Sequence, residues 1–165
     1  MTDRTVTDIR IEPVREQDVA LLLRLIKALA DYERLSGEVV ATEALLRESL
    51  FGSKPGVEAA LAYVGPDAVG FAVWFYNFST FVGRPGLYLE DIFVLPDWRS
   101  RGVGRALMGH LARLAVARGC GRMEWAVLDW NEPAVGFYRT LGAQAMDGWT
   151  VYRLAGDALA RASRL

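Results

Sequence analysis

The segment that decides the fold is residues 90–105, which read EDIFVLPDWRSRGVGR. The apolar run to Leu95 predicts a strand, and the sequence after Gly104 predicts a helix. Gly102 and Gly104 allow backbone N–H groups to approach phosphate oxygens closely. The start of the helix adds a partial positive charge of roughly half a unit. The segment therefore predicts a strand, a turn and a helix start that together can hold a pyrophosphate.

Length and composition predict one globular domain over residues 1–165. The chain is 52% apolar and 24% charged, which is typical of a globular protein with a substantial core. Its net charge is −1 and it has no run of lysine and arginine, which argues against a nucleic-acid partner. Its longest apolar stretches are far shorter than a membrane span, so no membrane partner is predicted.

Cysteine and histidine each occur once, as Cys120 and His110. A lone cysteine excludes an internal disulfide and fits a reducing compartment, and residues 1–5 lack the apolar core of a signal peptide. We therefore predict a cytoplasmic protein. Neither a cysteine–histidine nucleophile nor a metal site is expected, and His110 is predicted to lie on a helix surface or to pack there.

Predicted strands and helices alternate along the chain. Strands are predicted at residues 8–11, 58–64, 68–78, 87–95, 123–127 and 149–154. Helices are predicted at residues 19–30, 42–50, 104–118 and 131–141, with a short helix in the tail. The order predicts an α/β fold with a mixed sheet, which is antiparallel early and has a parallel crossover in the middle.

Two other phosphate-binding motifs fit residues 90–105 less well. A dinucleotide-binding turn would need a third glycine where Leu107 stands and a tighter turn, although Glu124 has a plausible spacing for a ribose contact. A nucleoside-triphosphate loop would need Lys-Ser or Lys-Thr where Arg105 and Ala106 stand. Taken alone, a glycine pair beside arginines is more often an ordinary solvated turn.

Several motifs in the chain resemble those of a known family. The pattern Arg99-x-x-Gly102-x-Gly104 after an apolar strand is similar to the cofactor loop of the GNAT superfamily of N-acetyltransferases. Others are similar to its diamine acetyltransferase subgroup, which contains spermidine/spermine and thialysine acetyltransferases. These are RLIK at 24–27, YE at 32–33, YLED at 88–91, WNEP at 130–133, FY at 137–138 and GW at 148–149. AVLDWN at 126–131 and LGAQ at 141–144 resemble the thialysine branch more closely.

The resemblance implies a GNAT-type fold with acetyl-coenzyme A as cosubstrate and no metal. It implies a mostly antiparallel central sheet with flanking helices and a splayed pair of parallel strands at the cofactor site. One backbone N–H of residues 92–94 would polarise the thioester carbonyl, and losing such a donor commonly costs about 3 kcal/mol. The residues that the resemblance assigns to acetyl-coenzyme A are Ile92, Phe93, Val94, Arg99, Ser100, Arg101, Gly102, Val103, Gly104, Arg105, Asn131, Pro133, Ala134 and Phe137.

Tyr138 stands at the family's general-acid position and would face the leaving sulfur. A free phenol has a pKa of about 10 and a thiol about 8.5, so proton transfer from tyrosine to the thiolate is uphill. We therefore expect Tyr138 to donate a strong hydrogen bond, or to transfer its proton only as the amine proton departs. The alternative interpretation is a helix aromatic that packs in the core beside Phe137 and Leu141.

Glu90 is the second predicted catalytic residue. A substrate ammonium has a pKa of about 10.4, and a carboxylate of pKa about 4.3 accepts its proton poorly. We therefore expect Glu90 to bind the cation and to relay its proton through ordered water, the alternative being a solvated residue on a strand edge. Strict alternation points Asp91 to the opposite face, which predicts a structural role for Asp91.

The resemblance also assigns residues to the amine substrate, namely Tyr32, Glu33, Glu90, Glu124, Trp125 and Ala126. Relatives that acetylate polyamines carry an acid in the loop before the fourth strand, where this chain has Ser79. The lost carboxylate favours a shorter amine that bears its own carboxylate, and Arg84 could pair with that group.

We expect an acetyl-coenzyme A-dependent N-acetyltransferase for a small primary amine, thialysine-like first and a diamine second. Direct attack in a ternary complex is expected, because no free nucleophile is available for an acetyl-enzyme. The resemblance also implies a homodimer. The alternatives are a polyamine acetyltransferase, an enzyme for a protein N-terminus or lysine, and a non-catalytic acyl-coenzyme A-binding regulatory module.

Overall fold

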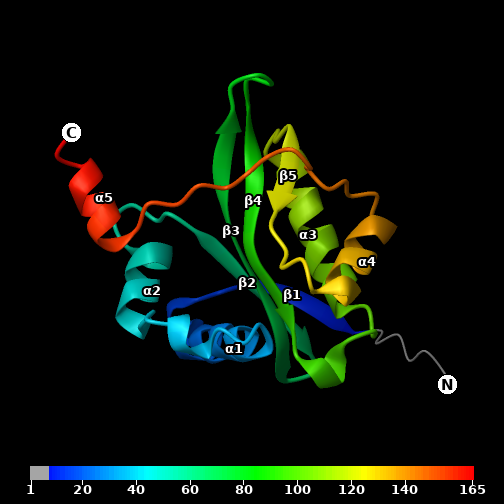
Figure 1. Cartoon of the computed structure of the whole chain (residues 1–165). Coiled ribbons are helices and arrows are strands. Elements are labelled where there is room, and N and C mark those ends of the chain that lie inside the picture. Colours follow the sequence, from blue (N-terminus) through cyan, green and yellow to red (C-terminus); the bar gives the residue numbers. More distant parts are fainter. Residues whose placement is uncertain (1–7) are drawn as a thin grey trace. The chain divides into compact units, whose positions relative to one another are not determined.

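The computed structural model describes residues 8–165, and the strands within this range form one five-stranded sheet of order β1-β2-β3-β4-β5 (Figure 1). Neighbouring strands are antiparallel from β1 to β4, whereas β4 and β5 are parallel. The strands are β1 (Ile9–Pro13), β2 (Glu58–Val64), β3 (Asp67–Ser79), β4 (Arg84–Val94) and β5 (Arg122–Trp125). The predicted α/β class, with its mixed and mostly antiparallel sheet, is confirmed.

Two helices begin where their capping residues predict. The hydroxyl Oγ1 of Thr42 accepts a hydrogen bond from the Leu45 N–H (3.2 Å), and Oδ1 of Asn131 accepts one from the Ala134 N–H (3.4 Å). The helices are α1 (Val19–Tyr32), α2 (Glu43–Phe51), α3 (Val103–Ala117), α4 (Glu132–Thr140) and α5 (Gly156–Ala162). Short 3-10 turns are η1 (Glu16–Asp18), η2 (Ser36–Glu38) and η3 (Pro96–Trp98).

The described chain divides into two compact units, which meet in the sequence between Ala126 and Val127. The first unit contains the sheet with α1, α2 and α3, and the second contains α4 and α5. The single domain over residues 1–165 stays a prediction. From residue 8 onward, no helix combines the length and the apolar character that a bilayer crossing would require.

The two faces of the sheet carry separate cores. Phe71 and Phe93 pack in one buried cluster with Leu25 of α1, and Val73 packs against the same cluster. The next residue along β3, Trp74, points to the other face, where its ring lies 6.3 Å from the His110 ring of α3. Buried side chains of this size stabilise the fold by about 2 kcal/mol each. The His110 side chain of α3 therefore packs against Trp74, in agreement with the predicted packing role.

The strand predicted at residues 149–154 is wrong. Among the described residues no strand pairs with this segment, and the side chains of Trp149, Val151 and Tyr152 are 79%, 87% and 92% exposed. A strand requires the backbone hydrogen-bond partners of a neighbour, which β-propensity alone does not supply. The fifth strand also ends at Trp125, earlier than the predicted Val127. The predicted short tail helix is present as α5.

Candidate active site

The turn between β4 and α3 has a backbone that fits an anion. Ser100 and Gly102 have positive φ angles of 58° and 92°. This region costs a residue with a side chain roughly 1–2 kcal/mol, which explains the glycine at the N-cap of α3. Within the described chain no side chain caps α3, and its first internal hydrogen bond runs from the Ala106 N–H to the Gly102 carbonyl. The N–H groups of residues 103–105 therefore have no partner within the helix and can bind a phosphate.

Arg99 and Arg101 both lie against aromatic rings. Nε of Arg99 donates to the Val94 carbonyl (3.0 Å), and its guanidinium carbon lies 4.2 Å from the centroid of the Tyr32 ring and 5.4 Å from that of Phe93. The guanidinium carbon of Arg101 lies 5.1 Å from the centroid of the Trp98 ring. Arg99 thus fixes the turn to the end of β4 and to the end of α1. The contacts of both arginines with a phosphate stay predictions.

The parallel pair β4 and β5 separates near the middle of β4. The two strands pair from Gly86 with Arg122 to Leu89 with Trp125, whereas β4 continues to Val94. Among the described residues, the strand that pairs with the second half of β4 is β3 alone. The predicted splay is therefore present. It leaves one edge of residues 92–94 open, where the resemblance places the pantetheine arm.

A β-bulge lies at the point where the two strands separate. Val73 of β3 pairs with Asp91, but the next residue, Trp74, pairs with Leu89, so Glu90 is an extra residue in β4. Directly paired residues share a face of the sheet. Leu89 therefore shares the α3 face with Trp74, while Asp91 shares the α1 face with Val73. Strict alternation would have left Leu89 and Asp91 on the same face, so the bulge reverses the side on which Asp91 lies.

Asp91 is an unpaired carboxylate on the α1 face. From residue 8 onward, no hydrogen bond or ion pair of its side chain is present. Burial, reinforced by the negative charges of Glu90 and Glu33, raises the pKa of Asp91 to about 6. Burial also raises the pKa of Glu33, the residue that follows α1. The structural role predicted for Asp91 has no contact to support it, and a bulge leaves no sign in the apolar pattern that could have indicated this.

The structure brings part of the predicted substrate set together. Tyr32 lies at the end of α1 with its ring centroid 6.2 Å from that of Phe93, and Glu33 follows it. Glu124 is paired elsewhere, because its Oε2 forms an ion pair with Nε of Arg122 (2.9 Å) and accepts a hydrogen bond from Nδ2 of Asn77 (3.5 Å). The roles of Glu124, Trp125 and Ala126 toward a substrate stay predictions.

The β3–β4 hairpin bears on the choice of amine. Ser79 is buried, and its hydroxyl accepts a hydrogen bond from the Val82 N–H (3.3 Å), so it holds the hairpin turn. Arg84 begins β4, and a rise of about 3.4 Å per residue places it roughly 20 Å from Glu90. The Arg84 and Glu90 side chains bridge part of this separation, so the pairing of Arg84 with a substrate carboxylate stays a prediction.

The second unit carries the remaining predicted residues. Asn131, Pro133 and Ala134 form the capped first turn of α4. Farther along this helix the rings of Phe137 and Tyr138 are half-buried, with centroids 5.6 Å apart. The contact of these residues with acetyl-coenzyme A and the general-acid role of Tyr138 stay predictions.

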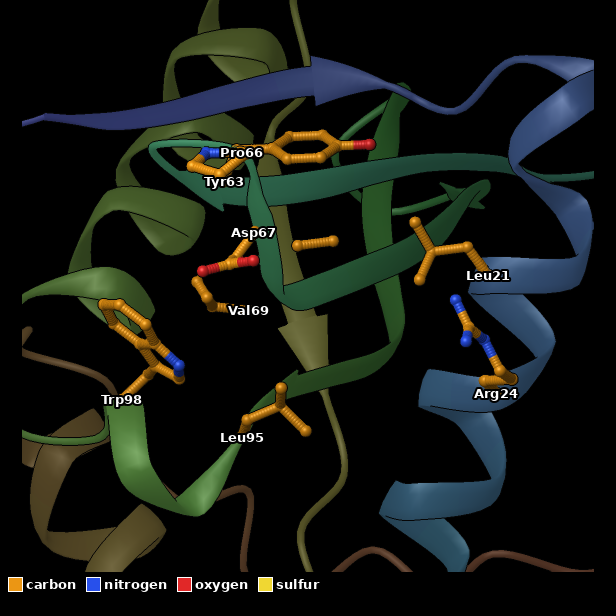
Figure 2. A pocket seen from close by; sticks show the side chains of 9 residues that line it. Leu21, Arg24, Tyr63, Pro66, Asp67, Val69, Leu95 and Trp98 are labelled. Atoms are coloured by element: carbon orange, nitrogen blue, oxygen red, sulfur yellow. The ribbon is translucent and has the colours of Figure 1, made fainter.

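A cavity of about 420 Å³ lies in the first unit between α1 and the turn that follows β4 (Figure 2). Arg24 of α1 faces it from one side, with Trp98 and Asp67 across from it in Figure 2. The residues predicted to bind the cosubstrate and the amine do not line it. The lining residues are Leu21, Arg24, Tyr63, Pro66, Asp67, Ala68, Val69, Leu95 and Trp98.

Comparisons with known proteins agree on the family. The sequence model of the Acetyltransferase (GNAT) family matches residues 24–143. A thialysine N-epsilon-acetyltransferase of Bos taurus is 37% identical over 162 residues, which cover 92% of this chain and 95% of that protein. An L-ornithine N5-acetyltransferase of Arabidopsis thaliana is 31% identical, over 94% of this chain and 88% of that protein.

A solved structure has the same fold. An integron cassette protein from the mobile metagenome of V. cholerae superposes with a TM-score of 0.78 at 27% identity, and the match covers 95% of this chain and 98% of the other. The resemblance of the motifs is thereby confirmed, and the protein is an enzyme. The chain belongs to the GNAT family of N-acetyltransferases, in the subgroup that contains the thialysine enzymes.

Proposed function

We propose that this enzyme transfers an acetyl group from acetyl-coenzyme A to the side-chain amine of a small amino acid. The observation that carries the proposal is the uncapped, glycine-initiated start of α3, which follows directly on a strand that has separated from its parallel neighbour. The two curated relatives described above are named for thialysine and L-ornithine, which are both amino acids ending in a primary amine. A thialysine-like acceptor therefore comes first and a diamine second.

The chain's own groups would hold the cosubstrate from both ends. The N–H groups of residues 103–105 bind the diphosphate, and the open edge of residues 92–94 holds the pantetheine arm. A backbone N–H on that edge donates to the thioester carbonyl as its oxygen gains charge. In the second unit, the residues assigned to the same ligand are Asn131, Pro133, Ala134 and Phe137.

The transfer would proceed by direct attack of the amine in a ternary complex. Glu90 contributes negative charge that binds the substrate ammonium, and Tyr138 donates a hydrogen bond to the departing sulfur. General-acid groups typically contribute 10²- to 10⁴-fold to a rate. We therefore expect Tyr138→Phe to lower kcat at least about a hundredfold and to change coenzyme A affinity little. Unchanged kcat would remove Tyr138 from this role, and a trapped acetyl-enzyme would exclude direct attack.

A small acceptor fits the chain better than a long polyamine. The buried Ser79 hydroxyl is hydrogen-bonded within the hairpin turn, and a serine supplies no negative charge for a second or third ammonium group. The sulfur in the thialysine side chain lowers its amine pKa, and each unit lowered removes about 1.4 kcal/mol from the cost of deprotonation.

Two measurements test the proposal. Calorimetry should detect coenzyme A binding, which Gly102→Ala weakens about tenfold because a Cβ at φ 92° is strained by roughly 1–2 kcal/mol. Gly37→Ala is the matched control, because open space surrounds a Cβ there. A thiol-release assay should then show turnover with thialysine or ornithine and little with spermidine.

Each negative result has its own meaning. No coenzyme A binding would overturn the proposal as a whole. Binding without thiol release from any amine would favour the non-catalytic acyl-coenzyme A-binding module. Release with spermidine alone would favour the polyamine acetyltransferase, and release with a protein N-terminus or lysine alone would favour a protein-directed enzyme.

We also propose that the enzyme works as a homodimer in the cytoplasm. Residues 149–154 alternate like a strand, yet they expose Trp149, Val151 and Tyr152, which a second copy of the chain would cover. Light scattering should give the mass of a dimer, and a monomeric mass at micromolar concentration would contradict this proposal.

A further inference from the structure

We infer that Asp91, rather than Glu90, takes the proton that the substrate ammonium must lose before it attacks. This assignment rests on the proposed acetyl transfer. It concerns the deprotonation of the substrate ammonium, for which the sequence predicts a relay from Glu90 through ordered water. Glu90 is exposed, whereas Asp91 is half-buried.

The bulge places Asp91 on the face where the predicted substrate wall lies. Its partner across the sheet is Val73, which packs against the α1 core, and two residues farther along β4 Phe93 lies in that core. The Tyr32 ring meets the Phe93 ring at 6.2 Å, so the carboxylate lies on the same face as this aromatic pair. An ammonium held there would meet a carboxylate that lacks a protein partner among residues 8–165.

Burial is the main cause that favours the protonated form of Asp91, and charges on the elements around it add to the effect. Glu90 on the same strand and Glu33 after α1 each raise its pKa, while Val73 on β3 is uncharged. The guanidinium of Arg99 lies over the Tyr32 and Phe93 rings and is bonded to the Val94 carbonyl. With burial added, the pKa rises from 3.8 to about 6, which corresponds to roughly a hundredfold gain in proton affinity.

The step balances without any further reactant. An N–H bond of the ammonium breaks, and its proton moves to a carboxylate oxygen of Asp91. The electron pair left on nitrogen forms the bond to the carbonyl carbon, and the C–S pair departs with the sulfur, which takes a proton from Tyr138. The nitrogen of the new amide loses its second proton to the Tyr138 oxygen, which replaces the proton given to the sulfur. Asp91 then releases its proton to solvent before the next turnover.

The pH dependence of kcat/KM for thialysine, between pH 5 and 9, tests the assignment. Wild-type activity should fall about tenfold per pH unit below about 6, because Asp91 must be ionised to accept the proton. D91N should lose at least about a hundredfold at pH 8 and should lack this acid limb. D91E keeps a carboxylate at the position and should recover the limb and part of the activity.

Variants of two residues near Asp91 test whether the pKa of Asp91 sets the position of the acid limb. E90Q and E33Q should each keep the acid limb but move it to lower pH, because each removes a negative charge that raises the Asp91 pKa. Calorimetric binding of coenzyme A reports whether each variant is folded. If D91N does not fold, the shifts in E90Q and E33Q still decide the assignment.

Three results would overturn the inference. One is a D91N enzyme that retains the acid limb, another is an E90Q enzyme that loses it, and the third is an acid limb that neither E90Q nor E33Q moves. In each case the wild type still acetylates thialysine, so the proposed function survives. A wild type that binds coenzyme A but acetylates no amine would overturn the proposed catalytic function and this inference with it.

Discussion

The two halves of β4 differ sharply although they belong to one strand. Residues 84–89 pair with β3, residues 86–89 also pair with β5, and Leu87 and Leu89 are only 0% and 1% exposed. Residues 90–94 begin with a bulge and pair with β3 alone among the described strands. They present an exposed Glu90 and a half-buried Asp91 that has a raised pKa.

The comparison shows how one strand can serve both stability and chemistry. The first half buries apolar side chains and satisfies its backbone groups, which stabilises the sheet. The second half leaves an edge open and turns a carboxylate toward α1, which weakens the local structure but creates a place for a ligand. Truncating an apolar side chain should therefore cost less stability in the second half than in the first, and removing the charge of Asp91 should raise stability.

The largest effect is expected in the first half. Leu89→Ala removes a fully buried side chain on the α3 face and should lower the free energy of unfolding by about 3 kcal/mol. Val94→Ala in the second half removes a half-buried side chain and should lower it by only about 1 kcal/mol. Urea unfolding of both variants at one pH measures the difference. Equal losses would show that the two halves do not differ in packing.

A smaller loss of stability is expected from a substitution in β3 beside the second half of β4. A Cβ on Gly70 would lie 2.6 Å from the Phe93 carbonyl oxygen, so Gly70→Ala must push the two strands apart. We expect a loss of about 1–3 kcal/mol in the free energy of unfolding. Gly56→Ala is the control, because nothing lies within 4 Å of a Cβ there. A neutral Gly70→Ala would mean that the second half of β4 can shift freely.

The smallest expected effect is an increase in stability, and it comes from removing the charge of Asp91. Because the pKa of Asp91 is raised in the folded state, its stabilising contribution is full below pH 3.8 and is lost as the pH rises through about 6. At pH 8 the ionised carboxylate destabilises the fold by on the order of 1–2 kcal/mol, after allowance for its partial exposure. Asp91→Asn should therefore raise stability at pH 8 and change it little at pH 4.

Thermal unfolding of wild type and Asp91→Asn at the two pH values measures this effect. Glu12→Gln is a control for a carboxylate in an exposed ion pair, which contributes about 0–1 kcal/mol. An Asp91→Asn protein that is less stable than wild type at pH 8 would show that the carboxylate has a structural role after all.

Local patterns in the sequence predicted most of the fold. The cap at Thr42, the cap at Asn131 and the strand before residues 96–105 depend on neighbouring residues, and all three are present. The prediction of a strand at residues 149–154 was wrong, because strand pairing depends on a partner far away in the sequence. A local pattern contains no information about such a partner.

The residues of the candidate site also differ in whether neighbouring residues were enough to identify them. Gly102 could be identified from the sequence because its role depends on a backbone angle and on the start of a helix. Both can be predicted from neighbouring residues. Tyr32 and Glu33 were assigned by resemblance, and the structure brings Tyr32 against Phe93. The face on which Asp91 lies could not be derived from the sequence, because it depends on the register between β3 and β4.

The sequence by itself determined the class of fold, the family and the segment suited to a diphosphate. The fold class and the diphosphate segment follow from hydrophobic period, helix caps and glycine positions, which act over a few residues, whereas the family was identified from the resemblance of several motifs. Only the tertiary structure decided where β4 leaves β5 and which carboxylate turns toward α1. The first is set by the end of β5 at Trp125 and the second by one extra residue in β4 opposite β3, so both depend on pairing between whole strands and not on local sequence.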